Sequence, residues 1–567
     1  MNAQDVIARF RPALAPELLL EYDYFTLYPN DGGGGFVMRD ELPSLSDAEI
    51  TDFIFNQDGL RNYGTPPALD YHKHAAWKTI ERSCWINRLY WIVPPARIAC
   101  LNKDAELGRK VVDSLLWFHR NQTPPATAEE AQKISEIITY RRDTEYNQGM
   151  FNNPEPVPYQ WYDFQPAARI IHIINALWFL KDLNCWNDAE AEELVDMVDT
   201  HARVIAWQEE VLPRLRGNHQ ALRGLSLLYA AVFLDNDCYL QHGIRITEGH
   251  AAHDFNPDGL LSEISPQYHC FETWMMRDAC SFARQYNIKL SAETMALPVK
   301  NALACALTTR PDGRAVAIND GCNLNTDIFL KTLPGFPEPP EFNTLLPSKL
   351  AIWRNRSWYM LMDCSLSHGQ FSHYHAGKNS INLFYQNQPF ILDAGCCHYD
   401  WPEFKSFFKR GEAHASLLVD GMGDGYVEGM YNWIHTAQCT LSEWENNRIK
   451  GTVTSDVPVW QNVKWERSLE CSDSGMVISD NITADRNHFY ELVFPLHPAV
   501  KVTLEDNIVT LTSGDAVLQI DANSETILTI GTAPSCWCDN VEIIPSKQLK
   551  IQFRGANCQV TTTIKGC

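Results

Sequence analysis

Two histidines two residues apart, in the stretch FSHYHAGKNS at residues 371–380, are the first candidates for chemistry in this sequence. Imidazole binds divalent metals and also transfers protons near neutral pH. If the stretch is a strand, His373 and His375 project from the same face, which is the arrangement of a His-x-His metal site. The alternative is a pair of surface histidines, and the spacing alone is compatible with both.

A carboxylate and a third histidine follow in two later motifs. Asp393 ends the apolar run FILDAG, where a carboxylate is costly unless it is paired or binds a metal. His414 comes shortly before the next apolar run. Together with His375 they form a set of two histidines and one carboxylate, which suits Zn²⁺ and also Mn²⁺. The sequence therefore predicts a divalent metal site, with a structural role, held by His375, Asp393 and His414.

Three more polar groups stand at the starts of predicted helices. In SPQYHCFETW, Tyr268 falls in a first helical turn, where the helix dipole favours a hydroxyl that has to lose its proton. In RGNHQALRGL, Asn218 and His219 precede an amphipathic run. Each place also has a structural alternative, because Asn218 is a good N-cap residue and a tyrosine often packs near a helix start.

Helical periodicity dominates the chain from about residue 45 to residue 330. Apolar residues recur at helical spacing in long segments joined by polar or Pro/Gly loops: 107–121, 169–183, 190–211 and 220–235. This pattern predicts an antiparallel array of helices.

Strand signals dominate after the proline-rich connector at 330–348. Residues 350–365 and 380–395 are rich in β-branched and aromatic residues between turn signals, and 501–513 has the pattern of a hairpin. Residues 547–566 continue the pattern. The order predicts an all-α domain followed by an antiparallel β-sandwich.

Composition excludes some partners. The net charge of −23 argues against nucleic acid, but an anionic substrate in a locally basic cleft remains compatible with it. No run reaches the length of a membrane span, and the N-terminal stretch lacks the apolar core of a secretory signal. With 17 scattered cysteines expected as free thiols, we expect a cytoplasmic protein, or a periplasmic one if a signal has been removed.

The motifs GNHQ, SPQYH, HYH, LDAG and RGEAH, in that order on a helical part followed by a β part, resemble the heparinase II/III superfamily of polysaccharide lyases. The resemblance covers about residues 60–560. It implies an incomplete (α/α) toroid over 1–335, whose first 45 residues are an extension, and an antiparallel β-sandwich over 336–567. The implied reaction is β-elimination on a uronic acid-containing polysaccharide, which leaves 4,5-unsaturated uronate ends.

Carried over by position, the resemblance implies that Tyr268 is the catalytic tyrosine and His373 the catalytic histidine. Asn218 and His219 would stabilise the substrate carboxylate and the developing enediolate. Two assignments of the base stay open. On a glucuronate Tyr268 could be both base and acid, whereas on an iduronate His373 would be the base and Tyr268 the acid.

The resemblance also implies that His375, Asp393 and His414 hold the divalent ion, Zn or Mn, beside the active site. One departure affects this site. Many relatives carry an acidic residue two positions after the second histidine, where this chain has Gly377. Second-sphere support of His375 by such an acid is therefore missing from the motif itself.

Several basic and aromatic side chains are candidates for substrate binding, although each has an alternative as a surface charge, an ion-pair partner or a core residue: Arg169, Trp161, Arg216, Lys378 and Arg410. The expected substrate is a glycosaminoglycan such as heparan sulfate, chondroitin sulfate or hyaluronan. Alginate or another polyuronate is the alternative substrate. We expect neither a nucleic acid nor a membrane as partner, and a homodimer is left open.

Two other classes of function remain at this point. A glycoside hydrolase would need two carboxylates that face each other across a cleft, and Glu263, Glu272 and Asp278 are the nearest available. They form no recognisable pair in the sequence. A carbohydrate-binding relative without catalytic activity is the second alternative.

Overall fold

The structure is a computed structural model and describes residues 2–13, 25–28, 35–38, 46–57, 60, 63–72, 86–141, 159–162, 164–211, 217–321, 326, 344–365, 373–397, 402–428, 432–445, 447–523, 525–536 and 543–567. It divides into two compact units. The first comprises Met1–Asp254 and Phe271–Pro298, and the second comprises Phe255–Cys270 and Val299–Cys567. The expected domain boundary at 335/336 lies outside the described residues.

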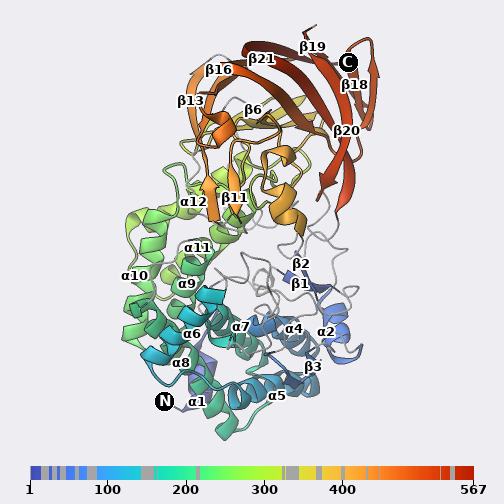
Figure 1. The fold of residues 1–567 in the computed structure, drawn as a ribbon. Coiled ribbons are helices and arrows are strands. Elements are labelled where there is room, and N and C mark those ends of the chain that lie inside the picture. The colour runs from blue at the N-terminus through green and yellow to red at the C-terminus, as the bar shows by residue number, and fades with distance from the viewer. Residues whose placement is uncertain are drawn as a thin grey trace. The chain divides into compact units, whose positions relative to one another are not determined.

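The first unit is built mainly from helices (Figure 1). They are α1 (Ala3–Arg9), α2 (Asp47–Phe55), α4 (Val93–Asn102), α5 (Ala105–Asn121), α6 (Ala128–Arg141), α7 (Phe164–Leu180), α8 (Asp188–Val211), α9 (Asn218–Leu234) and α10 (Asp237–His253). Helices α11 (Pro266–Gln285) and α12 (Ala292–Leu307) have residues in both units. The helices predicted over 107–121, 169–183, 190–211 and 220–235 are confirmed as α5, α7, α8 and α9.

Helices α9 and α10 show how the local sequence makes a helix pair. Asp235 takes a left-handed conformation at φ 60° and ends α9. Asn236 then starts α10, because its side chain accepts hydrogen bonds from the backbone N–H groups of Cys238 and Tyr239. The two helices pack on each other, and α7, which is buried on most of its surface, packs against α4, α8 and α9. The turn chemistry therefore places consecutive helices side by side.

A buried histidine on α10 predicts a pH-dependent stability of the first unit. Asp254 lies 2.7 Å from one ring nitrogen of His250 and Glu272 lies 3.2 Å from the other. Burial alone lowers the pKa of His250, but the two carboxylates outweigh it and raise this pKa to about 9. Because the folded-state pKa lies above the unfolded value near 6.5, the stabilisation is complete below about pH 6.5 and is lost as the pH rises through 9.

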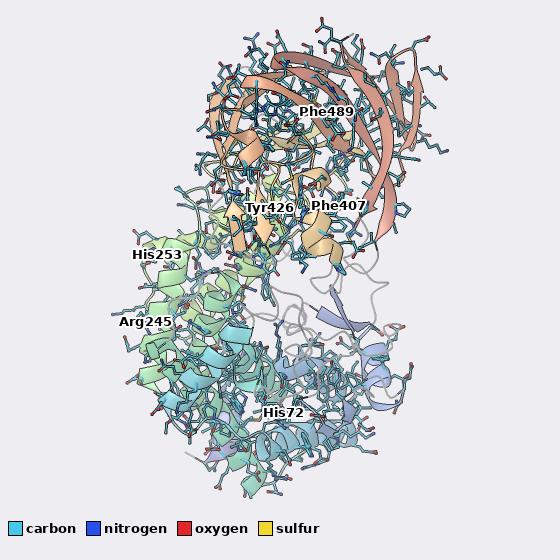
Figure 2. The ribbon with its side chains drawn as sticks, viewed as in Figure 1. His72, Arg245, His253, Phe407, Tyr426 and Phe489 are labelled. Atoms are coloured by element: carbon cyan, nitrogen blue, oxygen red, sulfur yellow. The ribbon has the colours of Figure 1, made fainter. Side chains whose placement is uncertain are left out.

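We expect this interaction to contribute on the order of 2 kcal/mol to the free energy of unfolding at pH 6 and little at pH 9.5. Urea unfolding of His250→Gln at the two pH values measures the difference from the unmodified protein. His253→Gln is the control, since His253 is exposed on the same helix (Figure 2). An equal destabilisation by His250→Gln at both pH values would contradict the prediction.

The second unit contains two large antiparallel sheets. The five-stranded sheet has the order β5 (Thr344–Leu345), β6 (Leu350–Arg354), β7 (Trp358–Asp363), β8 (Ser380–Tyr385) and β9 (Gln388–Ile391). The ten-stranded sheet contains β10 (Leu417–Val419), β13 (Ala437–Glu445), β14 (Arg448–Ser455), β15 (Lys464–Ser472), β16 (Gly475–Pro495), β17 (Lys501–Glu505), β18 (Ile508–Ser513), β19 (Ala516–Ala522), β20 (Ile527–Ser535) and β21 (Ile544–Gly566). Strands β16 and β21 run side by side over most of their length (Figure 1).

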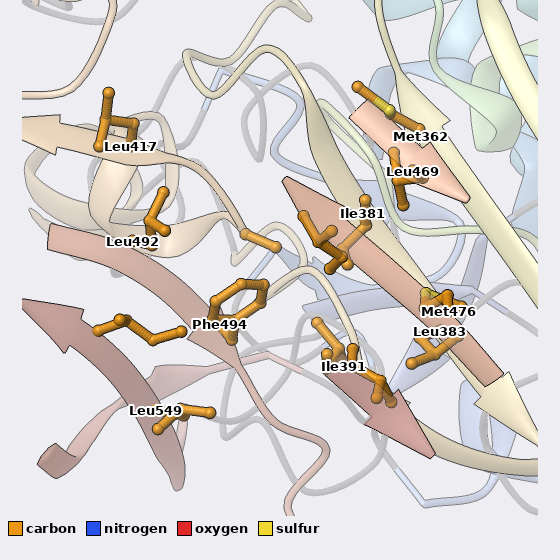
Figure 3. Close-up of a cluster of buried hydrophobic side chains, with 14 of the residues drawn as sticks. Met362, Ile381, Leu383, Ile391, Leu417, Leu469, Met476, Leu492, Phe494 and Leu549 are labelled. Carbon is orange, nitrogen blue, oxygen red and sulfur yellow. The ribbon is translucent and has the colours of Figure 1, made fainter. Parts of the chain in front are cut away.

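Apolar side chains from the facing surfaces of both sheets form one hydrophobic cluster (Figure 3). Met362 and Ile381 come from the five-stranded sheet, and Leu469, Leu492 and Phe494 come from the ten-stranded sheet. Sheets whose inner faces share a core in this way form a β-sandwich. The predicted sandwich is confirmed.

The five-stranded sheet is buried on both faces. Along β7, the alternate residues Tyr359 and Leu361 point away from the sandwich core and pack with Leu260 and Ala304 of the helical segments in the same unit. This explains why β7 lacks a polar face and reads as a continuous apolar run. Leu260 and Ile264 of this cluster lie in the loop that precedes α11, and Ala304 lies in α12.

Smaller elements complete the described chain: the hairpins β1 (Phe25–Tyr28) with β2 (Gly35–Met38), β3 (Gly64–Thr65) with β4 (Ala68–Leu69), and β11 (Tyr426–Glu428) with β12 (Asn432–His435). Among the described helices, none combines the length and the apolar character that crossing a bilayer requires. The cysteines that the structure describes are free thiols, as the sequence predicts.

Candidate active site

A tyrosine and a histidine stack face to face in the second unit. The ring centroids of Tyr268 and His373 lie 3.7 Å apart, and the ring planes meet at 18°. Glu263 contacts the histidine of this pair, and its Oε2 is hydrogen-bonded to His373 Nδ1. Burial alone lowers the pKa of His373, but the charge and hydrogen bond of Glu263 outweigh it, so that the pKa is raised. The cluster combines a phenol, an imidazole and a carboxylate, which are all proton-transfer groups.

Hydrogen bonds connect the three segments that carry this cluster. Ser265 precedes α11, and its hydroxyl accepts from Tyr268 N at 3.4 Å and donates to Asp320 O at 3.0 Å. Asn319 Nδ2 donates to Ile264 O at 2.8 Å, and Asn319 Oδ1 accepts from His375 N at 3.0 Å. The side chains of Ser265 and Asn319 therefore connect the backbones of the loop before α11, the loop at 319–320 and the histidine segment. Such support limits the movement of the reacting groups.

The backbone beside Glu263 adopts an unusual conformation. Ile264 has φ 56°, in the left-handed region that a β-branched residue rarely occupies. Strained residues of this kind persist where the surrounding contacts over-determine them, and they cluster at functional sites. Ile264 directly follows Glu263, the carboxylate that contacts His373.

The two histidines of the opening motif lie in an irregular segment and not in a strand, since β8 begins only at Ser380. The prediction that they share a strand face is wrong. Their rings take different partners: His373 contacts Glu263, whereas His375 Nε2 lies 2.6 Å from Asp320 Oδ1. Burial, partly offset by Asp320, lowers the pKa of His375 to about 4, so this histidine is neutral at physiological pH.

The expected metal set is partly assembled. His414 Nδ1 and Asp393 Oδ2 lie 2.7 Å apart, and the rings of His375 and His414 have centroids 5.6 Å apart. His375 Nδ1 and His414 Nε2 are buried and have no hydrogen-bond partner among the described residues. Two buried imidazole nitrogens without partners are costly unless something binds them. These two nitrogens fit a divalent ion. Asp393 is placed either to ligate the ion or to orient the ring of His414.

A second group of possible ligands shares His375. Ligand atoms of Asp320, His375 and Cys396 lie within 4.8 Å of one another, and all three side chains are buried. The ammonium of the buried Lys409 contributes to the low pKa of Asp320, although burial alone acts in the opposite direction. Because Lys409 already supplies a positive charge to Asp320, the better place for a metal is the other side of the His375 ring, which faces His414.

The structure explains the departure at Gly377. Gly377 has φ 108°, and a Cβ built there would lie 2.7 Å from the Cβ of His414. No side chain fits between the two segments, so an acid at this position is sterically excluded. A carboxylate nevertheless reaches the segment from another loop, because buried Asp424 accepts from Gly377 N at 2.6 Å and from Lys378 N at 2.8 Å.

Asn218 and His219 lie in the first unit, at the start of α9 and half-buried. Gly217 is the N-cap of this helix, so the interpretation of Asn218 as its cap is wrong by one residue. Tyr268, in contrast, lies in the first turn of α11, as predicted from the sequence.

Three of the residues expected to bind substrate are buried in the protein interior. Arg169 is 0% exposed and donates to the carbonyl oxygens of Asn87 and Gln160. Trp161 is 2% exposed and packs beneath the Arg169 guanidinium at 5.0 Å. Lys378 is 1% exposed, and its ammonium donates to Asp363 at 2.8 Å. These contacts correct the prediction: Arg169, Trp161 and Lys378 are buried, and the two cationic groups bond to other residues of the protein.

Arg410 keeps its place as a candidate for substrate binding. It is half-buried, its guanidinium carbon lies 5.7 Å from the ring centroid of Tyr426, and its Nε has no hydrogen-bond partner among the described residues. It lies four residues before His414 in the sequence. Arg216, the remaining candidate, lies outside the described residues.

The carboxylates considered for a hydrolase have separate partners. Glu263 contacts His373, Glu272 lies beside His250, and Asp278 accepts from Tyr229 at 2.8 Å. A glycosidase pair would instead flank a scissile bond across a cleft. These contacts give no support to the hydrolase alternative.

Sequence reasoning missed the roles of Glu263 and Asp320. Glu263 was considered only as half of a hydrolase pair, and the NDG motif at 319–321 received no role. Positive φ angles at both Ile264 and Asn319 mark these loops in the structure. The Asn-Asp-Gly composition of the second loop was the one signal in the sequence, since such residues favour special backbone conformations.

Comparisons with known proteins agree with this architecture. Residues 337–565 match the family model for the heparinase II/III-like C-terminal domain, and residues 143–300 match the model for alginate lyase. No curated protein matches the sequence.

Solved lyase structures share the fold. Heparinase III aligns with a TM-score of 0.69 at 14% identity, over 97% of this chain and 89% of its own. Heparan sulfate lyase HepC from Pedobacter heparinus gives 0.61 at 14%, over 100% and 86%. A Paenibacillus xanthan lyase gives 0.53 at 7%, over 99% and 56%.

The fold, a helical part followed by a β-sandwich, together with the two family matches defines a polysaccharide lyase that acts on an anionic polysaccharide. Residues 337–565 form a heparinase II/III-like C-terminal domain, and the chain shares the fold of solved heparinase III structures.

Proposed function

We propose that the enzyme cleaves a uronate-containing glycosaminoglycan by β-elimination at Tyr268 and His373. The observation that supports this proposal is the stacked Tyr268–His373 pair with Glu263 on His373 Nδ1. Elimination needs a base for the C5 proton and an acid for the O4 leaving group, and a phenol beside an imidazole can supply both.

The electron and proton balance of the step is simple. The base removes the C5 proton, the C4–O4 bond breaks, and a double bond forms between C4 and C5. The departing O4 takes a proton from the acid, so no water is consumed. Tyr268 serves as base and acid on a glucuronate, and His373 serves as base with Tyr268 as acid on an iduronate.

Glu263 has a positioning role in this proposal. Because Glu263 occupies Nδ1 of His373, only Nε2 remains to exchange a proton with the substrate. The carboxylate also stabilises the imidazolium form, as in other carboxylate–histidine pairs. Arg410 would bind an acidic group of the substrate through its guanidinium, whose Nε has no hydrogen-bond partner among the described residues.

A polyuronate such as alginate is the second candidate substrate. The match of residues 143–300 to the alginate lyase model favours it. Alginate carries carboxylates but no sulfate groups, so its anions differ from those of heparan sulfate and chondroitin sulfate but not from those of hyaluronan.

An absorbance assay tests the proposal. Heparan sulfate, chondroitin sulfate, hyaluronan and alginate are each incubated with the enzyme, and the ultraviolet absorbance of unsaturated uronate is followed. We expect one glycosaminoglycan to give the fastest increase. An increase with alginate alone would support the second candidate. New reducing ends without absorbance would exclude elimination.

A divalent metal, Zn²⁺ or Mn²⁺, is part of the proposal. His375 and His414 would ligate the ion, and Asp393 would either ligate it or orient His414. The bound ion would act mainly by fixing the segment that carries His373. The support is the pair of buried imidazole nitrogens without partners, His375 Nδ1 and His414 Nε2.

His375→Ala should lose the metal and lower stability together, by roughly 2–4 kcal/mol, because a buried site loses its ion and Nε2 of His414 loses its ligand. Elemental analysis of the purified variant and its thermal unfolding midpoint are the measurements. Cys396→Ala is the matched control, since it removes a ligand of the alternative group only. Retention of metal by His375→Ala, or its loss in Cys396→Ala, would contradict the assignment.

Three predictions from the sequence stay predictions: the role of Asn218 and His219 at the substrate carboxylate, a homodimer, and a cytoplasmic location.

A further inference from the structure

A cavity of about 330 Å³ in the second unit is lined by three arginines, Arg310, Arg354 and Arg356. It lies where the end of α12 meets the turn between β6 and β7 and the turn between β8 and β9. The rest of the lining includes the polar residues Asn355 and Asn387.

The three arginines differ in their partners. Arg310 is buried and donates to both carboxylate oxygens of Asp312, at 3.1 and 2.9 Å, so its charge is neutralised. Arg354 is half-buried, donates to the backbone carbonyl of Thr309 and lies over the ring of Tyr359 at 4.9 Å. Arg356 is exposed. Neither Arg354 nor Arg356 forms an ion pair with a described residue.

The nearby acidic groups are already bonded. Asp312 is paired with Arg310, and Asp473 accepts from Asn355 Nδ2 at 3.1 Å. The guanidinium groups of Arg354 and Arg356 therefore have no carboxylate partner among the described residues. Clustered positive charge of this kind raises the local concentration of anions, even in a chain of net charge −23.

The cavity is separate from the stacked pair. It includes Trp358 at the first residue of β7, whereas Asp363 at the last residue of this strand binds Lys378, three residues after His375. A rise of about 3.3 Å per residue over the five steps between Trp358 and Asp363 gives roughly 17 Å. The cavity and the histidine segment thus lie at opposite ends of the same strand.

The planar guanidinium fork of arginine matches the geometry of carboxylate and sulfate oxygens. We propose that Arg354 and Arg356 form an accessory binding site for a sulfate or carboxylate group of an acidic oligosaccharide, at a distance from the catalytic pair. That the ligand is a saccharide rests on the proposed function, whereas the binding of an anion rests on the arginines alone.

Calorimetric titration tests the proposal on the full chain. Tyr268→Phe prevents turnover, and the probes are a heparan sulfate tetrasaccharide, neutral cellotetraose and inorganic sulfate. Adding Arg356→Glu should weaken one tetrasaccharide-binding event roughly tenfold at low salt, and the difference should shrink as salt is added. Cellotetraose should show no dependence on Arg356.

Arg448→Glu is the matched control, since Arg448 is also exposed but lies on β14 of the ten-stranded sheet. Arg356 is exposed, and Arg448 forms only an exposed ion pair with Glu470, so both variants should change the unfolding midpoint little. Equal tetrasaccharide affinity in the two variants would overturn the site. Inorganic sulfate that binds as tightly as the tetrasaccharide would overturn the saccharide as its ligand.

The outcome can be separated from that of the proposed function. If no polymer yields unsaturated product but the tetrasaccharide still binds through Arg356, the accessory site stands and the proposed elimination fails. If product forms but Arg356→Glu binds like the control, elimination stands and the accessory site fails.

Discussion

Tyr268→Phe should lower kcat/KM for elimination at least about a thousandfold, because the substitution removes the only hydroxyl of the stacked pair. The phenyl ring keeps the contact with the His373 ring, whose centroid lies 3.7 Å away, so the fold should be retained. The rate of absorbance increase from unsaturated uronate measures the activity, and circular dichroism measures the folded state.

Tyr286→Phe is the matched control. Tyr286 directly follows α11, the helix that contains Tyr268, and its hydroxyl donates a hydrogen bond to the backbone carbonyl of Arg11. It should keep nearly full activity. If Tyr268→Phe also keeps nearly full activity, Tyr268 is not the acid or base, and the proposed mechanism is wrong.

His373→Ala should also lower kcat/KM by about a thousandfold, since it removes the imidazole that lies beside the phenol and bonds to Glu263. It leaves the Glu263 carboxylate buried without its partner, which lowers stability as well. The double variant Glu263→Gln/His373→Ala removes this unpaired charge. It should recover part of the stability but none of the activity.

His488→Ala controls for the loss of a histidine–carboxylate pair as such. His488 Nδ1 lies 2.7 Å from Asp420 Oδ2, which is the same type of contact as that between His373 and Glu263. His488, however, lies on β16 of the β-sandwich. We expect normal kcat/KM for this variant. Full activity in the folded double variant would show that His373 has no part in the chemistry.

Local sequence was sufficient for the elements that position the site. The apolar spacing over 169–183 and 190–211 predicted α7 and α8, because a helix buries one face at a period that any short window records. The two runs around Asp506 and Asn507 predicted the hairpin β17–β18 in the same way. The first-turn place of Tyr268 followed from the Ser-Pro dipeptide before it.

Patterns failed where a side chain's partner lies far along the chain. Arg169 and Lys378 looked like ligands for an acidic substrate, yet internal carbonyl and carboxylate groups occupy them. A charged side chain has the same signature in sequence whether it is solvated or buried with a partner. Burial is decided by the packing of whole elements, which a local window does not contain.

The sequence by itself determined the order of helices and strands, the place of Tyr268 at a helix start and the residues available for chemistry. Only the tertiary structure decided their pairing. Glu263 and Asp320 lie 110 and 55 residues before the histidines that they contact. Hydrophobic periodicity is a local property of the chain, whereas hydrogen bonds across such separations form only after the sheets and helices have packed. For this reason, the sequence could assign different roles to His373 and His375, but only the structure shows Glu263 and Asp320 as their partners.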